Sequence, residues 1–411
     1  MIASHRQLLI LLSLYIAQGL PFGFFTQAMP AIMRTEGIEL KYIGLMSLLA
    51  LPWALKFLWA PFLDKYQFLS FPLRKGWILL ANGLAVVSLL IFSQGDQAWW
   101  LSSGIVFTML ILLGLNIFAA SQDISTDALA IETISADRRG LLNGIQVSGY
   151  RIGMIIGGGA ILAWLPVMGW QYAMWLMALL LVLASAPVVL MTAHINVANN
   201  PVDDSAAGES IFVSWKGLFQ RNGIWLWIGL LVLYKIGDSF GTAMLKPLMI
   251  DSGYQLQDVA IIMGTWGVVA GLIGAILGAL LVKPLGRFKA LVFFALLQAV
   301  SLFLYGIYAH GLMPRDGFIV LCVIEHITGA MATIGIFTVM MDYCREHHAG
   351  LDYSFQSCLI IASGLVAGSI SGFSVEAFGY FLHFTIAAGL TLLGLVWVVV
   401  QRKFIVSVTA N

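Results

Sequence analysis

The stretches Leu14-Tyr-Ile-Ala-Gln-Gly19 and Leu233-Tyr-Lys-Ile-Gly-Asp238 resemble each other and lie about 218 residues apart. The landmarks that follow each stretch also correspond: Pro30 to Pro247, the turn at 37–40 to the turn at 253–256, and Lys65 to Lys283. A repeat of this length indicates that the chain contains two copies of one multi-helix unit.

The composition is that of a membrane protein. Hydrophobic residues make up 60% of the 411 residues, charged residues make up 10%, and the mean hydropathy is +0.93. Apolar runs of about 18 to 25 residues recur between short polar breaks, which is long enough for a helix to cross about 30 Å of hydrocarbon. The sequence therefore predicts about twelve spans, at 7–33, 41–62, 75–93, 99–130, 140–164, 169–192, 222–249, 257–281, 287–308, 313–342, 351–374 and 378–401.

These spans predict an all-α integral membrane protein with two pseudo-symmetric six-helix bundles, at 1–192 and 222–411. Turn formers cluster between the bundles and indicate a linker over 193–221. Of the 21 Lys and Arg residues, 14 lie in one set of alternate loops and in both tails, and 3 lie in the opposite loops. This bias predicts that both termini and the linker are cytoplasmic. No cleavable signal peptide is expected, because the first apolar run is too long.

Duplication of a multi-span unit is typical of secondary transporters, which hold a substrate between two repeats that rock against each other. We therefore expect a transporter of a small molecule, surrounded by membrane lipids. A net charge of +1 argues against a nucleic-acid partner. The cysteines Cys322, Cys344 and Cys358 lack the spacing of metal ligands, so no metal site is expected.

Other function classes are alternatives to this interpretation. A passive channel or an exporter would have the same composition. A membrane-bound enzyme would need converging catalytic groups, and Ser121 beside Asp123 is the only hint of them. Because no polar stretch exceeds about 30 residues, there is no room for a catalytic domain, and we expect no enzyme activity.

Ionisable residues inside the predicted spans are candidates for function, because an unpaired charge in the membrane is costly. Asp123 and Asp127 lie four residues apart and share one face of the fourth helix. Two carboxylates this close do not both ionise without a cation between them, so we expect a proton-coupling site. Arg151 is the first candidate for the cation, and Lys56 is the second. The alternative is a static charge network that only holds the helices in register.

The second half carries its own set of charges. Lys235 and Asp238 lie three residues apart on the seventh helix, close enough to neutralise each other and to border a central substrate site. Glu325 and His326 are adjacent in the tenth helix, where the histidine could relay a proton to the carboxylate. A neutral, hydrogen-bonded histidine is the alternative.

The first helix contributes Gln18 and Gln27 among several phenylalanines, and Trp53 follows in the second helix. Amide groups and aromatic rings of this kind can contact a substrate, together with Lys56, Arg151 and Lys235. Ordinary helix packing explains the phenylalanines equally well, and tryptophans near helix ends are often interfacial anchors.

A gate is predicted at the turn that contains Asp64 and Lys65. The Asp64 carboxylate could pair with Arg138 or Arg139 on a neighbouring loop and release it when the helices separate. A permanent ion pair that stabilises the turn is the alternative.

The basic turns after the second span of each half, Asp64-Lys65 with Arg74-Lys75-Gly76 and Lys283 to Arg287, resemble the loop signature of the major facilitator superfamily. Further motifs, in order along the chain, resemble the AmpG-type permeases of that superfamily: Leu51-Pro-Trp53, Lys56 to Pro61, Ser121-Gln-Asp123, Gly149-Tyr-Arg151 and Leu233 to Asp238. This resemblance implies the superfamily fold, alternating access, symport into the cell across the bacterial inner membrane, the proton as coupling ion with no other cofactor, and a monomer.

AmpG-type permeases divide by cargo: one group takes anhydromuropeptides from cell-wall turnover, and the RhtX/FptX-like group takes iron-siderophores, such as the pyochelin type. Three features depart from the muropeptide pattern. The first helix is rich in aromatic residues and amides, the stretch 363–368 lacks the arginine that an enteric muropeptide permease shows there, and an extension after the twelfth span is missing. We therefore expect iron-siderophore uptake, with anhydromuropeptide uptake as the alternative.

Overall fold

The computed structural model describes residues 5–36, 49–67, 71–189, 211–345 and 347–409. Nine helices in these ranges are long and apolar enough to cross a membrane. Two of them, at 136–189 and 349–400, are 54 and 52 residues long, and each is broken at a glycine with positive φ, Gly169 or Gly379. Each of these two is long enough for two spans, so the nine helices supply eleven spans (9 + 2). One predicted span remains, at 41–62. Its part at 41–48 lies outside the described residues.

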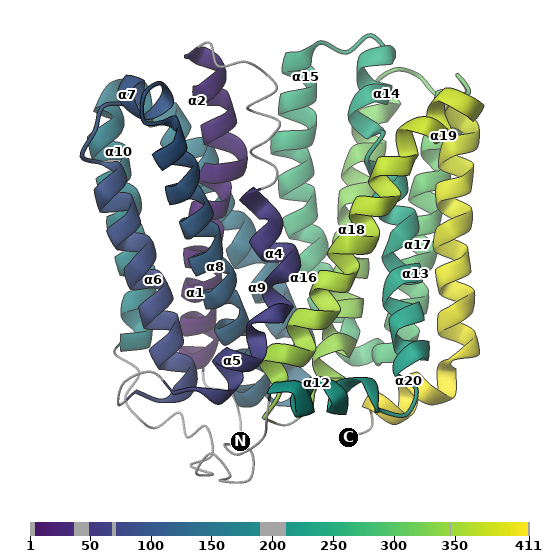
Figure 1. Cartoon of the computed structure of the whole chain (residues 1–411). Coiled ribbons are helices and arrows are strands. Elements are labelled where there is room, and N and C mark those ends of the chain that lie inside the picture. The colour runs from purple at the N-terminus through teal and green to yellow at the C-terminus, as the bar shows by residue number, and fades with distance from the viewer. Residues whose placement is uncertain (1–4, 37–48, 68–70, 190–210, 346, 410–411) are drawn as a thin grey trace. The chain divides into compact units, whose positions relative to one another are not determined.

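Contacts divide the chain into two compact units. Unit 1 contains residues 1–135, 145–216 and 344–358, and unit 2 contains residues 136–144, 217–343 and 359–411. The helices of unit 1 are α1 (His5–Gly23), η1 (Phe24–Ala28), α2 (Met29–Thr35), α4 (Leu51–Leu55), η3 (Lys56–Leu58), α5 (Ala60–Lys65), α6 (Leu73–Phe92), α7 (Gln97–Leu101), α8 (Ile105–Thr133), most of α9 (Arg139–Met154), η5 (Ile155–Ala160), α10 (Ile161–Val189) and most of α12 (Ile211–Phe219). Figure 1 shows α6, α8 and α10 running lengthwise, with the short α7 at one end of them.

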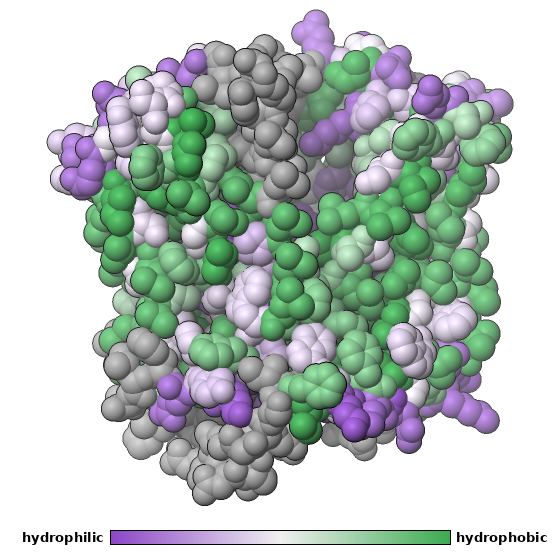
Figure 2. Space-filling view, in the orientation of Figure 1, coloured by the Kyte–Doolittle hydropathy of each residue, from purple (hydrophilic) through white to green (hydrophobic). Residues whose placement is uncertain are grey.

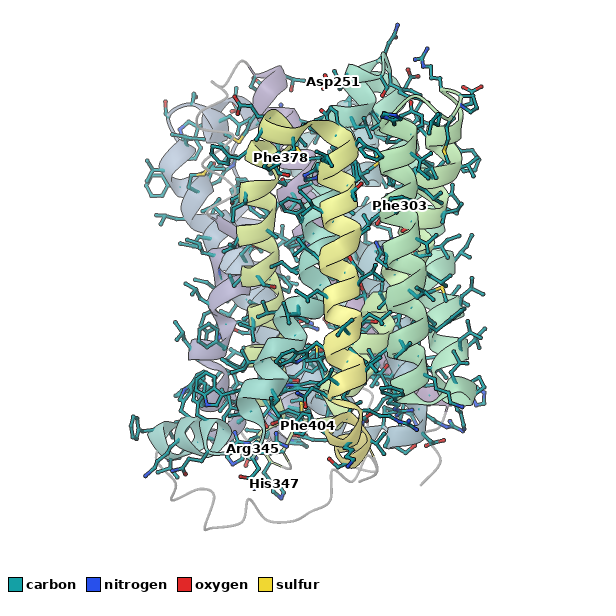
Figure 3. The ribbon with its side chains drawn as sticks, turned by 90° about the vertical axis from the view of Figure 1, so that its right-hand side faces the viewer. Asp251, Phe303, Arg345, His347, Phe378 and Phe404 are labelled. Carbon is teal, nitrogen blue, oxygen red and sulfur yellow. The ribbon has the colours of Figure 1, made fainter. Side chains whose placement is uncertain are left out.

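Unit 2 is also entirely helical over the residues that the structure describes. It contains η4 (Ala136–Arg138), α13 (Ile224–Thr242), α14 (Leu245–Asp251), α15 (Leu256–Ile261), η6 (Ile262–Trp266), α16 (Gly267–Leu285), α17 (Arg287–Ala309), α18 (Gly317–Asp342), most of α19 (Ala349–Val400) and α20 (Arg402–Thr409). In Figure 3, Asp251 and Phe404 lie at opposite ends of this unit. The 23 residues of α17 correspond to about 34 Å of helix, which is enough to cross a bilayer.

The predicted domain boundaries differ from the contact units at two helix starts. Residues 136–144 belong with unit 2 because Gly140 and Gly144 pack against Val282 and Ala279 of α16. Residues 344–358 belong with unit 1, where the Tyr353 hydroxyl donates to Gln146 at 3.4 Å. The predicted linker at 193–221 contains the helix α12, and its part at 193–210 lies outside the described residues. The fourth span, predicted at 99–130, begins at Ile105 instead.

Glycines set the close approach of α1 to α9 and η5. They recur every four residues on both sides, at Gly149, Gly153 and Gly157 and at Gly19 and Gly23. A Cβ on Gly157 would lie 2.0 Å from the carbonyl oxygen of Leu20, so any side chain there would push the backbones apart. Small residues at this spacing allow membrane helices to pack backbone against backbone. Gly237, which is 218 residues after Gly19, has the same role on α13, where a Cβ would lie 2.5 Å from the Ala387 carbonyl oxygen.

The outer surface matches a hydrocarbon environment. Large apolar side chains are exposed along the middle of the spanning helices, for example Leu296 at 46% and Val300 at 50% on α17. In Figure 2 the hydrophobic residues cover the middle of the visible face, and hydrophilic residues gather at the helix ends. Since a soluble protein rarely exposes apolar patches of this size, the surface supports the membrane assignment.

The glycine packing leads to a prediction with a matched control. Gly157→Ala should destabilise the protein by about 1–3 kcal/mol, because the added methyl group overpacks the contact with Leu20. Gly159→Ala is the control, because a Cβ at Gly159 has nothing within 4 Å and the gain in helix propensity is the same. Unfolding of the purified protein in detergent measures both changes. Equal stability of the two variants would contradict the packing argument.

Candidate functional site

A buried ion pair between Lys56 and Asp123 forms the centre of the candidate site in unit 1. The two side chains are in direct contact, and they are 4% and 7% exposed. Gln18 Nε2 also donates to Asp123 Oδ1 at 2.6 Å. Lys56 reaches this position from the single 3₁₀ turn η3, which is followed by α5 with Pro61 in its first turn. Proline is favoured in the first turn of a helix and is disfavoured inside one, so the sequence itself divides this span into short helices.

Asp127 lies one helical turn from Asp123 and is only 2% exposed. Its Oδ1 accepts hydrogen bonds from the Tyr15 hydroxyl at 3.0 Å and from Gln146 Nε2 at 2.9 Å. Among the described contacts, Asp127 therefore has neutral donors, whereas Asp123 has a cation. An ionised carboxylate in such surroundings is costly, and the charge of Asp123 adds to the cost. Asp127 is thus the carboxyl of this pair that is better suited to hold a proton.

The other predicted residues of unit 1 lie around this centre. Arg151, the first candidate for the cation, is half-buried on α9, and the cation that contacts Asp123 is Lys56 instead. Gln27 is exposed and lies against Gly158 of η5, away from the ion pair that Gln18 joins. The structure therefore favours Lys56, the second candidate, over Arg151 as the counter-charge of Asp123.

Three aromatic rings from three helices meet beside the ion pair. The ring centroids of Phe22 and Trp53 are 5.3 Å apart, and those of Phe22 and Tyr150 are 5.5 Å apart. Trp53 Nε1 donates to Asn116 Oδ1 at 2.9 Å, which fixes the indole, and Lys56 Nζ lies 6.0 Å from the indole ring. All three rings are half-buried. Half-exposed rings beside a cation can pack against the rings of a ligand that also carries a carboxylate.

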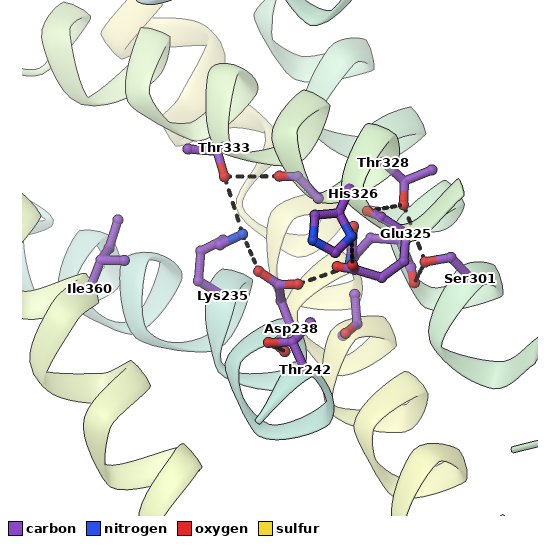
Figure 4. A network of polar contacts seen from close by, with 12 residues as sticks. Lys235, Asp238, Thr242, Ser301, Glu325, His326, Thr328, Thr333 and Ile360 are labelled. Atoms are coloured by element: carbon purple, nitrogen blue, oxygen red, sulfur yellow. Dashed lines mark hydrogen bonds and ion pairs between the residues drawn. The ribbon is translucent and has the colours of Figure 1, made fainter. Parts of the chain in front are cut away.

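Unit 2 contains a second polar network, which Figure 4 shows from close by. Lys235 is in direct contact with Asp238, and Lys235 Nζ donates to Thr333 Oγ1 at 3.2 Å. Gln298 Nε2 donates to Asp238 Oδ1 at 2.8 Å and points to Glu325 Oε1 at 3.4 Å. One neutral amide thus bridges two carboxylates that sit on different helices.

Glu325 and His326 extend this network on α18. His326 Nδ1 lies 2.8 Å from Glu325 Oε2 and 2.9 Å from the Cys322 carbonyl oxygen, so Nδ1 carries a hydrogen. A Cβ on Gly267 would lie 2.6 Å from His326 Nε2, so the ring fits only because residue 267 is glycine. The structure therefore joins all four charged residues that the sequence indicated in this half.

The predicted gate has different partners from those expected. Asp64 Oδ1 accepts from Arg74 Nη1 at 2.6 Å, and the backbone N–H groups of Gly350 and Leu351 donate to the same carboxylate at 3.2 and 2.8 Å. Asp64 therefore caps the start of α19, where unsatisfied N–H groups attract an anion. Burial raises the pKa of Asp64 above its usual value, although Arg74 and the Leu351 N–H oppose this shift. Arg74 also binds Glu132 at 2.6 Å.

The basic residues expected to pair with Asp64 lie elsewhere. Arg139 Nη1 binds Asp342 Oδ1 at 2.8 Å, and Arg287 Nε binds the other oxygen of Asp342 at 3.0 Å. Arg138 lies in the short helix η4, and Lys65 Nζ lies 5.4 Å from the Tyr66 ring. Charged side chains thus contact both segments that group with the unit of the other sequence half, 136–144 and 344–358. The gating role of these residues stays a prediction.

Sequence reasoning missed several polar residues of these sites. Tyr15, Gln146 and Gln298 supply the hydrogen bonds that connect the charges, and Arg74 is the true partner of Asp64. A tyrosine or glutamine inside an apolar span is a signal for such a partner, because a buried polar group needs a hydrogen bond. Its spacing along one helix does not show which other helix it meets.

The buried pair predicts a pattern of stabilities. Lys56→Met should destabilise the protein by about 3–5 kcal/mol, because it leaves the buried carboxylate of Asp123 without its cation. Combining it with Asp123→Leu should recover most of the loss. Lys283→Met is the control, since Lys283 and its partner Asp137 are 67% and 55% exposed, and such surface pairs contribute about 0–1 kcal/mol. Unfolding in detergent measures all three, and a Lys56→Met cost as small as the control would contradict the role of the pair.

Comparison with known proteins places this chain among transporters. Residues 11–356 match the sequence profile of the Major Facilitator Superfamily. The anhydromuropeptide permease of Escherichia coli K12 is 30% identical over 407 residues, which cover 96% of this chain and 79% of the permease. A protein of Rickettsia conorii that carries the name AmpG 4 is 25% identical over 390 residues, which cover 92% of both chains.

Solved structures show the same fold. The proton:xylose symporter XylE aligns with a TM-score of 0.72 at 13% identity, covering 97% of this chain and 96% of XylE. The fucose:proton symporter FucP of E. coli aligns with a TM-score of 0.66 at 14% identity, covering 96% and 98% of the two chains. These matches confirm the fold class and the resemblance drawn from the sequence. The chain belongs to the major facilitator superfamily, a family of transporters and not of enzymes, and it is a relative of the AmpG-type permeases.

Proposed function

We propose that this protein imports anhydromuropeptides across the bacterial inner membrane together with protons. The observation that carries the proposal is the 30% identity with the E. coli anhydromuropeptide permease over 96% of this chain. The iron-siderophore cargo expected from the sequence has no support among the relatives described above, and it is retained as the alternative. In this proposal both termini are cytoplasmic, as the distribution of Lys and Arg predicts.

The candidate site has the chemistry that such a cargo requires. An anhydromuropeptide combines sugar rings with the carboxylates of its lactyl and peptide parts. The aromatic group of Phe22, Trp53 and Tyr150 supplies surfaces for the rings. Lys56 and Lys235 are cations held beside carboxylates, and each ammonium group has three donors, so it can bind a carboxylate of the cargo as well. A flat siderophore with phenolate oxygens would suit the same groups, and the identity with the anhydromuropeptide permease favours the muropeptide over it.

Proton coupling in this proposal depends on the difference between Asp123 and Asp127. Asp123 stays ionised because Lys56 contacts it, whereas Asp127 takes up and releases the proton. Tyr15 and Gln146 donate to Oδ1 of Asp127, which leaves Oδ2 as the oxygen that carries the proton. Gln146 in turn accepts from Tyr353 at the start of α19, so the state of Asp127 is connected to a segment that a transport cycle must move.

A deletion strain tests the cargo directly. Loss of the gene should stop the recovery of radiolabelled anhydromuropeptides from the cell wall and leave growth on iron-siderophores unchanged, because only the first cargo uses this permease. Plasmid-borne wild type should restore the recovery, and a protonophore should abolish it. Normal wall recycling together with a growth defect on an iron-siderophore would show instead that the siderophore alternative is correct.

A further inference from the structure

Unit 1 has an open groove on its outer surface over α6, α7 and α8, with a volume of about 420 Å³. Its lining is mostly apolar and includes Ile91 of α6, Trp99 of α7, and Phe107, Leu110, Gly114 and Phe118 of α8. Ile91, Phe107 and Leu110 are 52%, 58% and 59% exposed, as is typical of side chains that face lipid. The groove is separate from the charged residues of the candidate site.

The groove has the length and position of one leaflet of a bilayer. Phe107, Leu110, Gly114 and Phe118 follow one face of α8, and the 11 steps along the helix from Phe107 to Phe118 (118 − 107) correspond to about 16 Å. Half of a hydrocarbon core of about 30 Å is close to this value. The groove ends at α7, where the capping carboxylate of Asp96 and the exposed Trp99 mark a boundary between membrane and water.

Two other occupants fit the groove poorly. The cargo of the proposed function carries carboxylates, and no charged side chain lines the groove in the described part of the chain. A second copy of the chain would need an interface of about 20–30 residues on each side, which is far more than this groove offers. An apolar, flexible chain from the surrounding bilayer matches its surface, its length and its exposure.

We infer that the acyl chain of one phospholipid binds in this groove and is held more tightly than the surrounding lipid. Its glycerol end lies beside α7, and its methyl end lies beside Phe118. The acyl chain adds contacts along the surface where α6 and α8 already pack against each other, so it stabilises their packing further.

Gly114 allows a sharp test of the site. A Cβ at Gly114 would meet only the Phe118 ring, at 3.7 Å, so a larger side chain enters the groove without a clash. Gly83 on α6 is the matched control, because a Cβ there has nothing within 4 Å and Gly83 does not line the groove. The experiment counts the phospholipids that stay bound to the purified full chain in native mass spectrometry. Gly114→Leu should retain one phospholipid fewer than the wild type, and Gly83→Leu should retain the wild-type number.

A second readout follows stability when phosphatidylethanolamine is added back to delipidated protein. The wild type and Gly83→Leu should gain thermal stability, and Gly114→Leu should gain less. If Gly114→Leu does not yield folded protein, Leu110→Trp narrows the same groove from an exposed position and should give the same result. Equal numbers of retained lipids and equal stabilisation in the wild type and the groove variants would overturn the inference. The test uses no transport assay, so its failure and that of the proposed function are distinguishable.

Discussion

The contact between Lys56 and Asp123 is the interaction on which the rest of the site depends. Both groups are nearly free of water, so neither can stay ionised without the other. The pair keeps one carboxylate of α8 charged, and Asp127, one turn away, must then be stabilised by neutral donors or by a proton. The glycines of α1 and α9 hold these two helices together, and α1 in turn reaches the carboxylates of α8 through Tyr15 and Gln18.

The network of unit 2 uses the same chemistry with different connections. Lys235 neutralises Asp238 within one helix, so this pair needs no second helix to hold it. Gln298 then connects Asp238 to Glu325, whose carboxylate lies beside His326. In both units a glutamine amide joins a carboxylate to a second polar group, which lets a change of charge at one position alter a hydrogen bond on another helix.

Much of the fold could be predicted from the sequence, because the bilayer imposes simple rules on length and hydrophobicity. The repeat near Gly19 and Gly237, most spans and the superfamily followed from these rules and from the motifs. The partners of the charges did not, because spacing along one helix shows which residues share a face but not which helix that face meets. The sequence ranked Arg151 ahead of Lys56 as the counter-charge of Asp123, and only the fold shows that Lys56 makes the contact. The capping of the α19 start by Asp64 is likewise a contact across 286 residues of sequence.

The central claim is that Asp127 carries the proton while Lys56 keeps Asp123 ionised. Protein reconstituted in liposomes with a pH-sensitive dye inside, at zero membrane potential, measures it most directly. An inward gradient of anhydromuropeptide should acidify the interior with wild type and with Asp96→Asn, a control carboxylate at the start of α7. Asp127→Asn should still exchange labelled substrate but should not acidify the interior. Substrate flux without acidification in the wild type, or normal acidification with Asp127→Asn, would contradict the account.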